Sequence, residues 1–204
     1  MQIKLDGLSE SQTYFTMTQT VMPRPIAWVL SENEDASLNL APFSYFNAVC
    51  TDPPLLMVSI NLQDDGSEKD TLRNIRQRSQ FVIHIASDNQ LDVVNQSSAT
   101  LAPGESEVAA SGLLTTAFEG YHMPRLSDCK IALMCERHQT QAIGDKGQTL
   151  LFAEIKEIYL ADDCAEVNDK GRLKVFADKV QPLARLGAGE YASFGDILNA
   201  ARPT

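Results

Sequence analysis

The segment with the clearest capacity for chemistry is Asn39-Leu40-Ala41-Pro42-Phe43-Ser44-Tyr45-Phe46-Asn47. Pro42 removes a backbone donor from its middle, and polar residues stand beside the phenylalanines, so the segment does not alternate as a half-buried strand does. Aromatic side chains can cover the faces of a flat ligand while hydroxyl, amide and backbone N–H groups meet its edges. The composition favours a small-molecule site, and an edge strand bent by Pro42 remains the alternative.

A second candidate is Lys69-Asp70-Thr71, at the start of a helix that the pattern predicts over residues 70–78. A phosphate monoester is bound well by unpaired N–H groups at a helix N-terminus, together with a cation and a hydroxyl. Lys69 would be the cation and the Thr71 hydroxyl a donor. The alternative is a plain amphipathic helix with Ser67 and Asp70 as its capping box, and spacing alone favours that alternative.

The remaining reactive residue types form no recognisable motif. Three histidines are isolated from any nucleophile motif and are expected to be structural: His84, His122 and His138. Four cysteines lack zinc-ligand spacing and are expected to be buried thiols: Cys50, Cys129, Cys135 and Cys164. The sequence therefore predicts no metal site.

The elements that must position these residues are mainly strands. Residues 26–30 read as a buried strand, 38–49 as an extended segment and 55–60 as a central strand, joined by short turns in an antiparallel meander. In the helix over 70–78, Leu72 and Ile75 are expected to face inward, and three arginines to lie near the exposed side: Arg73, Arg76 and Arg78.

Further patterns complete the expected fold. Residues 80–86 alternate as a strand, 88–100 form a helix with Leu91 and Val94 inward, and 103–110 form an acidic surface loop. Strands are expected over 130–137 and 150–160, with a hairpin turn at 145–148, a second turn at 168–171, and a short helix that ends near Pro203. Six or more strands on short turns predict a small barrel with appended helices.

Composition sets broad limits on function. The chain of 204 residues is 44% hydrophobic, which suits a single domain over 1–204. A net charge of -10 argues against a nucleic-acid or anionic-membrane partner, because counterion release needs a clustered basic face. The N-terminus has no signal-like apolar run and no window of about 18 apolar residues occurs, so we expect a cytoplasmic protein.

Five ordered blocks resemble the flavin reductase-like family of FMN-binding split-barrel proteins, which includes flavoredoxin. These blocks are Arg24-Pro25-Ile26-Ala27-Trp28-Val29, the 39–47 segment, Asp52-Pro53-Pro54, Lys69-Asp70-Thr71-Leu72-Arg73-Asn74-Ile75 and Pro182-Leu183-Ala184-Arg185-Leu186-Gly187. The resemblance covers residues 21 to about 195. It implies a mainly β fold with peripheral helices, a six-stranded antiparallel split β-barrel, a homodimer, and non-covalent FMN in a groove near the subunit interface.

Carried over by position, the resemblance also implies site residues. The flavin ring and ribityl chain would meet Ser44, Tyr45, Phe46 and Asn47, with Ser59 and Ile60 nearby. The phosphate would lie at Lys69, Asp70 and Thr71, and the tail would contribute Arg185 and Tyr191, with Arg24 a weaker candidate. The chain departs from the family pattern at Glu105-Ser106-Glu107-Val108, which leaves the shape of the pocket mouth open.

Three functions remain open on this reading. The leading one is an FMN-dependent oxidoreductase in which NADH or NADPH passes hydride to the flavin, so no catalytic acid or base is required. The second is an FMN-carrying electron-transfer protein that serves an electron-acceptor protein and has little NAD(P)H activity. The third is a split-barrel module that binds no flavin and acts as a structural or regulatory domain.

Overall fold

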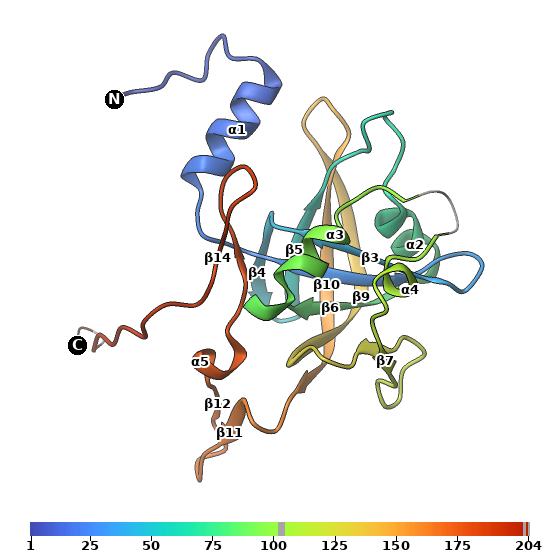
Figure 1. Cartoon of the computed structure of the whole chain (residues 1–204), viewed down its shortest axis with the longest axis vertical. Helices are drawn as coiled ribbons and strands as arrows, with labels where there is room; N and C mark the ends of the chain where they lie inside the picture. Colours follow the sequence, from blue (N-terminus) through green and yellow to red (C-terminus); the bar gives the residue numbers. More distant parts are fainter. Residues whose placement is uncertain (102–104, 202, 204) are drawn as a thin grey trace.

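The computed structural model describes residues 1–101, 105–201 and 203, and it is mainly β with a few helices (Figure 1). The main sheet has seven antiparallel strands in the order β3-β2-β6-β9-β10-β5-β4. In that order the strands are Leu38–Phe43, Ala27–Glu32, Gln80–Ile85, Ile131–Ile143, Gln148–Leu160, Pro54–Ile60 and Phe46–Thr51.

Smaller elements surround this sheet. The helices are α1 Glu10–Thr20, α2 Asp70–Arg78, the 3₁₀ turn Asp88–Gln90, α3 Leu91–Gln96, α4 Glu107–Ala110 and α5 Ala177–Val180. The short strands are β1 Arg24–Pro25, β7 Thr115–Thr116, β8 Arg125–Leu126, β11 Ala165–Val167, β12 Leu173–Val175, β13 Ala184–Arg185 and β14 Tyr191–Ala192. β13 pairs with both β1 and β14, so the tail returns to the start of the first long strand.

The sheet curls because its two outer strands are consecutive in the chain. β3 ends at Phe43 and β4 begins at Phe46, yet they occupy opposite ends of the strand order. Only Ser44 and Tyr45 connect them, and the expected continuous segment over 38–49 is interrupted there. This break gives seven strands where six were expected. No ladder closes the sheet between β3 and β4 within the described ranges.

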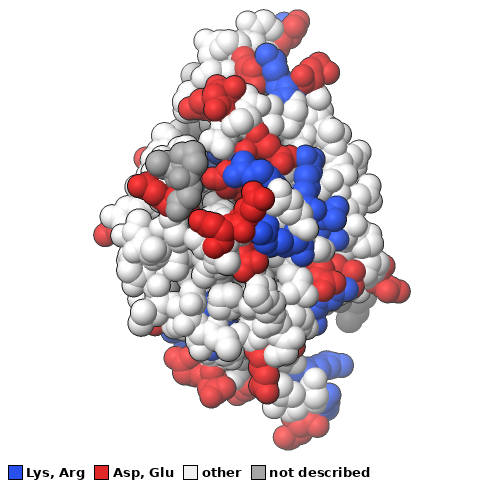
Figure 2. All heavy atoms as spheres, turned by 90° about the vertical axis from the view of Figure 1, so that its right-hand side faces the viewer, with Lys and Arg blue, Asp and Glu red and all other residues white. Residues whose placement is uncertain are grey.

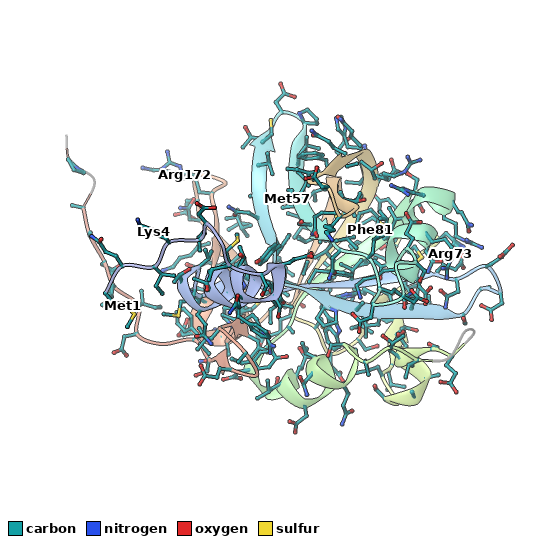
Figure 3. All side chains as sticks on the ribbon, turned by 90° about the horizontal axis from the view of Figure 1, so that it is seen from above. Met1, Lys4, Met57, Arg73, Phe81 and Arg172 are labelled. Atoms are coloured by element: carbon teal, nitrogen blue, oxygen red, sulfur yellow. The ribbon has the colours of Figure 1, made fainter. Side chains whose placement is uncertain are left out.

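Two apolar cores lie on the two faces of this curled sheet. One contains Phe81, Ile83 and Val58 together with Leu72 and Ile75 of α2. The other contains Trp28, Val82 and Met134 and is covered by α3, α4 and the segment before β9. Phe81 lies among packed side chains while Arg73 lies on the outer side of α2 (Figure 3). The alternation in β6 and the inward residues of α2 are as predicted.

Buried polar residues connect these layers. The Trp28 indole Nε1 donates to Ser97 Oγ at 2.9 Å, which joins β2 to the residue after α3. His84 is fully buried in β6 and its Nδ1 lies 3.2 Å from the Trp28 carbonyl. The Leu126 N–H donates to His84 Nε2 at 2.9 Å, and burial lowers the pKa of His84 to about 3. The prediction that His84 is structural is confirmed.

Several local predictions are wrong. Ser67 and Asp70 do not form a capping box, because Lys69 is the residue that precedes the first turn of α2. The predicted helix over 88–100 ends at Gln96, and Leu91 is 36% exposed. Within the described part of 103–110, Glu107–Ala110 is helical and Glu107 is buried, since its carboxylate accepts from the Leu40 N–H of edge strand β3. Residues 103 and 104 of that predicted loop lie outside the described ranges.

Other differences concern the tail and the cysteines. Residues 193–201 are not helical, and a helical turn occurs instead at α5. Cys129, Cys135 and Cys164 are buried thiols as expected, whereas Cys50 is exposed on edge strand β4. Both hairpin turns are found where predicted, between β9 and β10 and between β11 and β12. No described helix has the length and apolar character needed to cross a membrane.

Charges lie in mixed clusters over the face that carries α2 (Figure 2). Arg73 and Arg76 are exposed as expected, Arg78 is half-buried, and each pairs with an acid: Arg73 with Asp70, Arg76 with Glu68 and Arg78 with Glu32. The three arginines of α2 therefore do not form an unopposed positive patch.

Candidate functional site

Three adjoining hollows follow strand β3. The first two have volumes of about 500 and 210 Å³ and share Tyr14, Pro42, Phe43 and Ser44. The second adjoins the third, of about 60 Å³, at Ser98. We refer to the three hollows together as the β3 groove. It runs from Tyr45 at one end to Lys69 at the other.

The wide end of the β3 groove contains several residues that the sequence predicted. Ser44, Tyr45 and Ser59 line its largest hollow, and Arg185 and Tyr191 line the middle one. The Ser59 N–H donates to the Tyr45 carbonyl at 2.8 Å, which fixes the β3–β4 connection against β5. This end is therefore a mixed aromatic and hydroxyl-bearing wall of the kind that suits a planar ligand.

Strand pairing explains why β3 can offer backbone groups to a ligand. Pro42 is paired with Trp28 and has no N–H, so its pair is of the non-hydrogen-bonded type. Leu40, two residues earlier, shares this orientation, and its N–H points away from β2 to Glu107. The Pro42 carbonyl consequently faces the groove side of the strand.

Three predicted residues lie elsewhere. Ile60 is 1% exposed and belongs to the apolar core around Phe81. Phe46 packs partly buried against the same core, and Asn47 is exposed with its side-chain oxygen accepting from the Ala48 N–H. None of the three lines the β3 groove in this single chain, so their contact with a cofactor stays a prediction.

The narrow end of the groove brings together Lys69, Asp70 and Thr71. No side chain caps the N-terminus of α2, and Lys69 has no ion-pair partner within the described residues. Thr71 is buried, and its hydroxyl oxygen accepts from Asn39 Nδ2 at 2.9 Å, so its own proton remains available to donate. An open helix N-terminus with a free ammonium and a hydroxyl is suited to an anion.

Two carboxyl groups also border this narrow end. Asp70 is paired with Arg73, which directs its charge along the outer side of α2. Glu107 accepts from the Leu40 N–H at 3.0 Å, and burial raises its pKa. Each of these carboxylates is thus paired with a group other than the Lys69 ammonium.

The middle of the groove holds an unsatisfied donor. Arg185 Nη1 is buried and has no hydrogen-bond partner among the described residues, although the guanidinium lies 4.3 Å from the centre of the Tyr191 ring. Buried polar groups are rarely left unpaired, so an orphaned guanidinium nitrogen marks a place for a ligand acceptor.

Sequence reasoning missed several groove residues. Tyr14 comes from α1, and Ser98 follows α3, while Asn61 and Gln148 come from the ends of β5 and β10. Gln148 Nε2 donates to Ser59 Oγ at 2.7 Å, which orients that predicted residue. The aromatic pair Tyr14 and Phe15 was a visible signal, but nothing in the local pattern connected it to β3.

The fold and groove define a class of protein: a curled antiparallel sheet with a ligand groove along one edge strand. Residues 17–179 match the model of the flavin reductase like domain, and the chain belongs to that family. The resemblance noted from the sequence blocks is confirmed, as is the mainly β fold.

Relatives extend over nearly the whole chain. An uncharacterised protein of Halalkalibacterium halodurans is 33% identical over 208 residues, covering 100% of this chain and 97% of that protein. Nitrilotriacetate monooxygenase component B from Bacillus cereus is 29% identical, with a TM-score of 0.88 and 98% of each chain covered. The 2-nitrobenzoate 2-nitroreductase of Pseudomonas fluorescens is 31% identical, with a TM-score of 0.88, covering 100% of this chain and 97% of that one.

Flavoredoxin of Desulfovibrio vulgaris is more distant. It is 21% identical with a TM-score of 0.75, and the similarity covers 98% of this chain and 97% of that one. At this identity the comparison shows the shared fold. The similar solved structures therefore include a monooxygenase component, a nitroreductase and a flavoredoxin.

Proposed function

We propose that this protein binds FMN non-covalently in the β3 groove and acts as an NAD(P)H-dependent flavin reductase-like oxidoreductase. The observation that carries the proposal is the polarity of the groove, with an aromatic and hydroxyl-bearing hollow at Tyr45 and an open helix N-terminus with Lys69 at the other end. Family membership and the two oxidoreductase relatives near 30% identity support the same class of reaction.

The residues present fit this cofactor. The orphaned Nη1 of Arg185 offers a donor in the middle of the groove, and Ser44 and Tyr45 offer hydroxyl groups at its wide end. Lys69, the Thr71 hydroxyl and the first N–H groups of α2 would bind the phosphate. A bound flavin would supply the hydride chemistry, while the protein supplies orientation and electrostatics.

The hydride donor and the electron acceptor can be tested directly. We expect that purified protein is yellow or takes up FMN, and that NADH or NADPH bleaches the flavin absorbance in anaerobic stopped-flow measurements. Bleaching by dithionite but by neither nicotinamide would instead favour the electron carrier that serves an acceptor protein. Protein that stays colourless after incubation with FMN would favour a module without flavin.

We also propose a homodimer in which α1 and the C-terminal tail cover a second copy. Helix α1 borders the β3 groove through Tyr14 but otherwise projects from the sheet, and the N-terminal segment with Met1 and Lys4 extends away from it (Figures 1 and 3). Its large apolar side chains are exposed: Tyr14 by 55%, Phe15 by 53% and Met17 by 42%. Leu198 in the tail is 91% exposed. Several large exposed apolar side chains on one short helix support an interaction site there.

Phe15→Glu is expected to shift the dimer toward monomer, because a charge would be buried at the apolar surface of α1. We expect dimer dissociation to rise by more than tenfold, measured by light scattering at micromolar protein with and without FMN. Leu114→Glu is the matched control, since Leu114 is 70% exposed but lies in the segment before β7. A wild-type monomer that keeps stoichiometric FMN at high dilution would contradict both the dimer and the placement of its interface beside the site.

A further inference from the structure

Two arginines lie directly opposite each other beside the β3 groove. Arg24 of β1 is the register partner of Arg185 of β13. Like charges on paired positions oppose strand association, so such a pair normally has compensating anions nearby. Neither guanidinium has a carboxylate partner within the described part of the chain, although the protein carries a net charge of -10.

Arg24 is the buried member of the pair, at 5% exposure. Its Nη1 donates to the Thr18 and Val21 carbonyls, both at 2.7 Å, and its Nη2 donates to the Leu186 carbonyl at 2.8 Å. The first two carbonyls lie at the C-terminal end of α1, where the helix dipole is negative. Neutral acceptors and a partial dipole therefore hold this cation, and most of its charge remains uncompensated.

The same contacts direct Arg24 toward the groove. Its Nε donates to Ser44 Oγ at 3.3 Å, and Ser44 lines both the wide and the middle hollow. Through its other hydrogen bonds Arg24 joins α1, which contributes Tyr14, to the tail, which contributes Arg185. Burial raises the pKa of the groove residue Tyr45, Tyr14 raises it further, and the charge of Arg24 lowers it. The field of Arg24 thus reaches the groove wall.

A flavin in this position would change its charge on reduction. Two electrons and two protons convert the oxidised ring to the neutral reduced ring, and release of one of those protons leaves a negative charge that the oxidised ring lacks. Resting on the FMN site proposed above, we propose that Arg24 and Arg185 together stabilise this anionic reduced flavin. Arg24 acts as a positioning residue through Ser44, and Arg185 acts through the donor that has no hydrogen-bond partner among the described residues.

The arginine pair can be tested by measuring midpoint potentials with reference dyes in the full-length, FMN-loaded protein. For Arg185→Gln and Arg24→Gln we expect reduced FMN to bind about tenfold more weakly relative to oxidised FMN, which lowers the two-electron potential by about 30 mV. Arg24→Lys should retain most of the wild-type potential. Arg172→Gln, in the β11–β12 turn, removes the same charge away from the groove and should leave the potential unchanged.

Two further measurements separate the alternatives. A folded Arg185→Gln protein that binds FMN with an unchanged midpoint potential would overturn the proposal. A variant that loses affinity for oxidised FMN but not for riboflavin would also overturn it, because Arg185 would then bind the phosphate. If Arg24→Gln does not fold, the pH dependence of the wild-type midpoint potential still tests the proposal. The slope of the potential of bound FMN against pH should change from about 59 to about 30 mV per pH unit at a lower pH than it does for free FMN. A change at the same pH as free FMN would contradict the pair's role, whereas failure of wild type to bind FMN would contradict the proposed function itself.

Discussion

Replacing Lys69 by alanine is expected to weaken FMN binding ten- to a hundredfold while riboflavin binding hardly changes. A charge-assisted hydrogen bond to phosphate contributes about 1.5 to 3 kcal/mol, which corresponds to this range of affinity. Lys69 precedes an α2 N-terminus that no side chain caps, and it has no ion-pair partner in the described part of the chain. Its ammonium is therefore free to serve a ligand phosphate.

Fluorescence titration with FMN and riboflavin measures this effect for each variant. Lys69→Arg should keep much of the FMN affinity because the charge is retained. Lys170→Ala, in the turn between β11 and β12, is the control for loss of one positive charge elsewhere. If Lys69→Ala weakens both ligands equally, or neither, Lys69 is not the phosphate cation.

Acidification is expected to destabilise the fold through His84. The folded protein keeps this histidine neutral down to a pKa of about 3, whereas the unfolded chain takes up a proton near the ordinary value of 6.5. The unfolded state thus binds more protons in this window, so stability is lost as pH falls from 6.5 toward 3. The slope approaches about 1.4 kcal/mol per pH unit, and the loss between pH 6.5 and 5 is about 1.6 kcal/mol.

Urea unfolding of wild type and His84→Gln at pH 7, 6 and 5 tests this linkage. At pH 7 the variant should lose about 2 to 5 kcal/mol, since the Leu126 N–H and the Trp28 carbonyl lose their buried partner. The difference between the two proteins should then shrink as the pH falls. His122→Gln is the control, because the His122 side chain is 74% exposed. Parallel pH profiles for wild type and His84→Gln would show that His84 does not carry the acid sensitivity.

Local sequence patterns predicted much of the framework because burial periodicity is a local property. The alternation of Phe81 and Ile83 against Val82 and His84 placed β6, and Leu72 with Ile75 placed the inner face of α2. Turn residues placed the β9–β10 and β11–β12 hairpins. In contrast, the predicted tail helix did not form, and the helix predicted over 88–100 ends at Gln96, since residues 98–100 are exposed and lack the packing partners that stabilise a helix.

The candidate site was only partly readable in this way. The segments around Ser44 and Lys69 were marked by their unusual residue types, and the family blocks connected them. Glu107 looked like part of an acidic surface loop, yet it is buried because an edge strand left the Leu40 N–H without a partner. Such a requirement arises only when the sheet is assembled.

The sequence by itself determined the mainly β class, the family and the segments that carry the unusual polar and aromatic residues. Only the tertiary structure decided which of those residues share the β3 groove, placing Ser44 and Arg185 there while Ile60 and Asn47 lie outside it. Arg24 and Arg185 are 161 positions apart, and their pairing depends on β13 returning to β1. Spacing along a chain reports the burial of one element, whereas a groove depends on where separate elements meet.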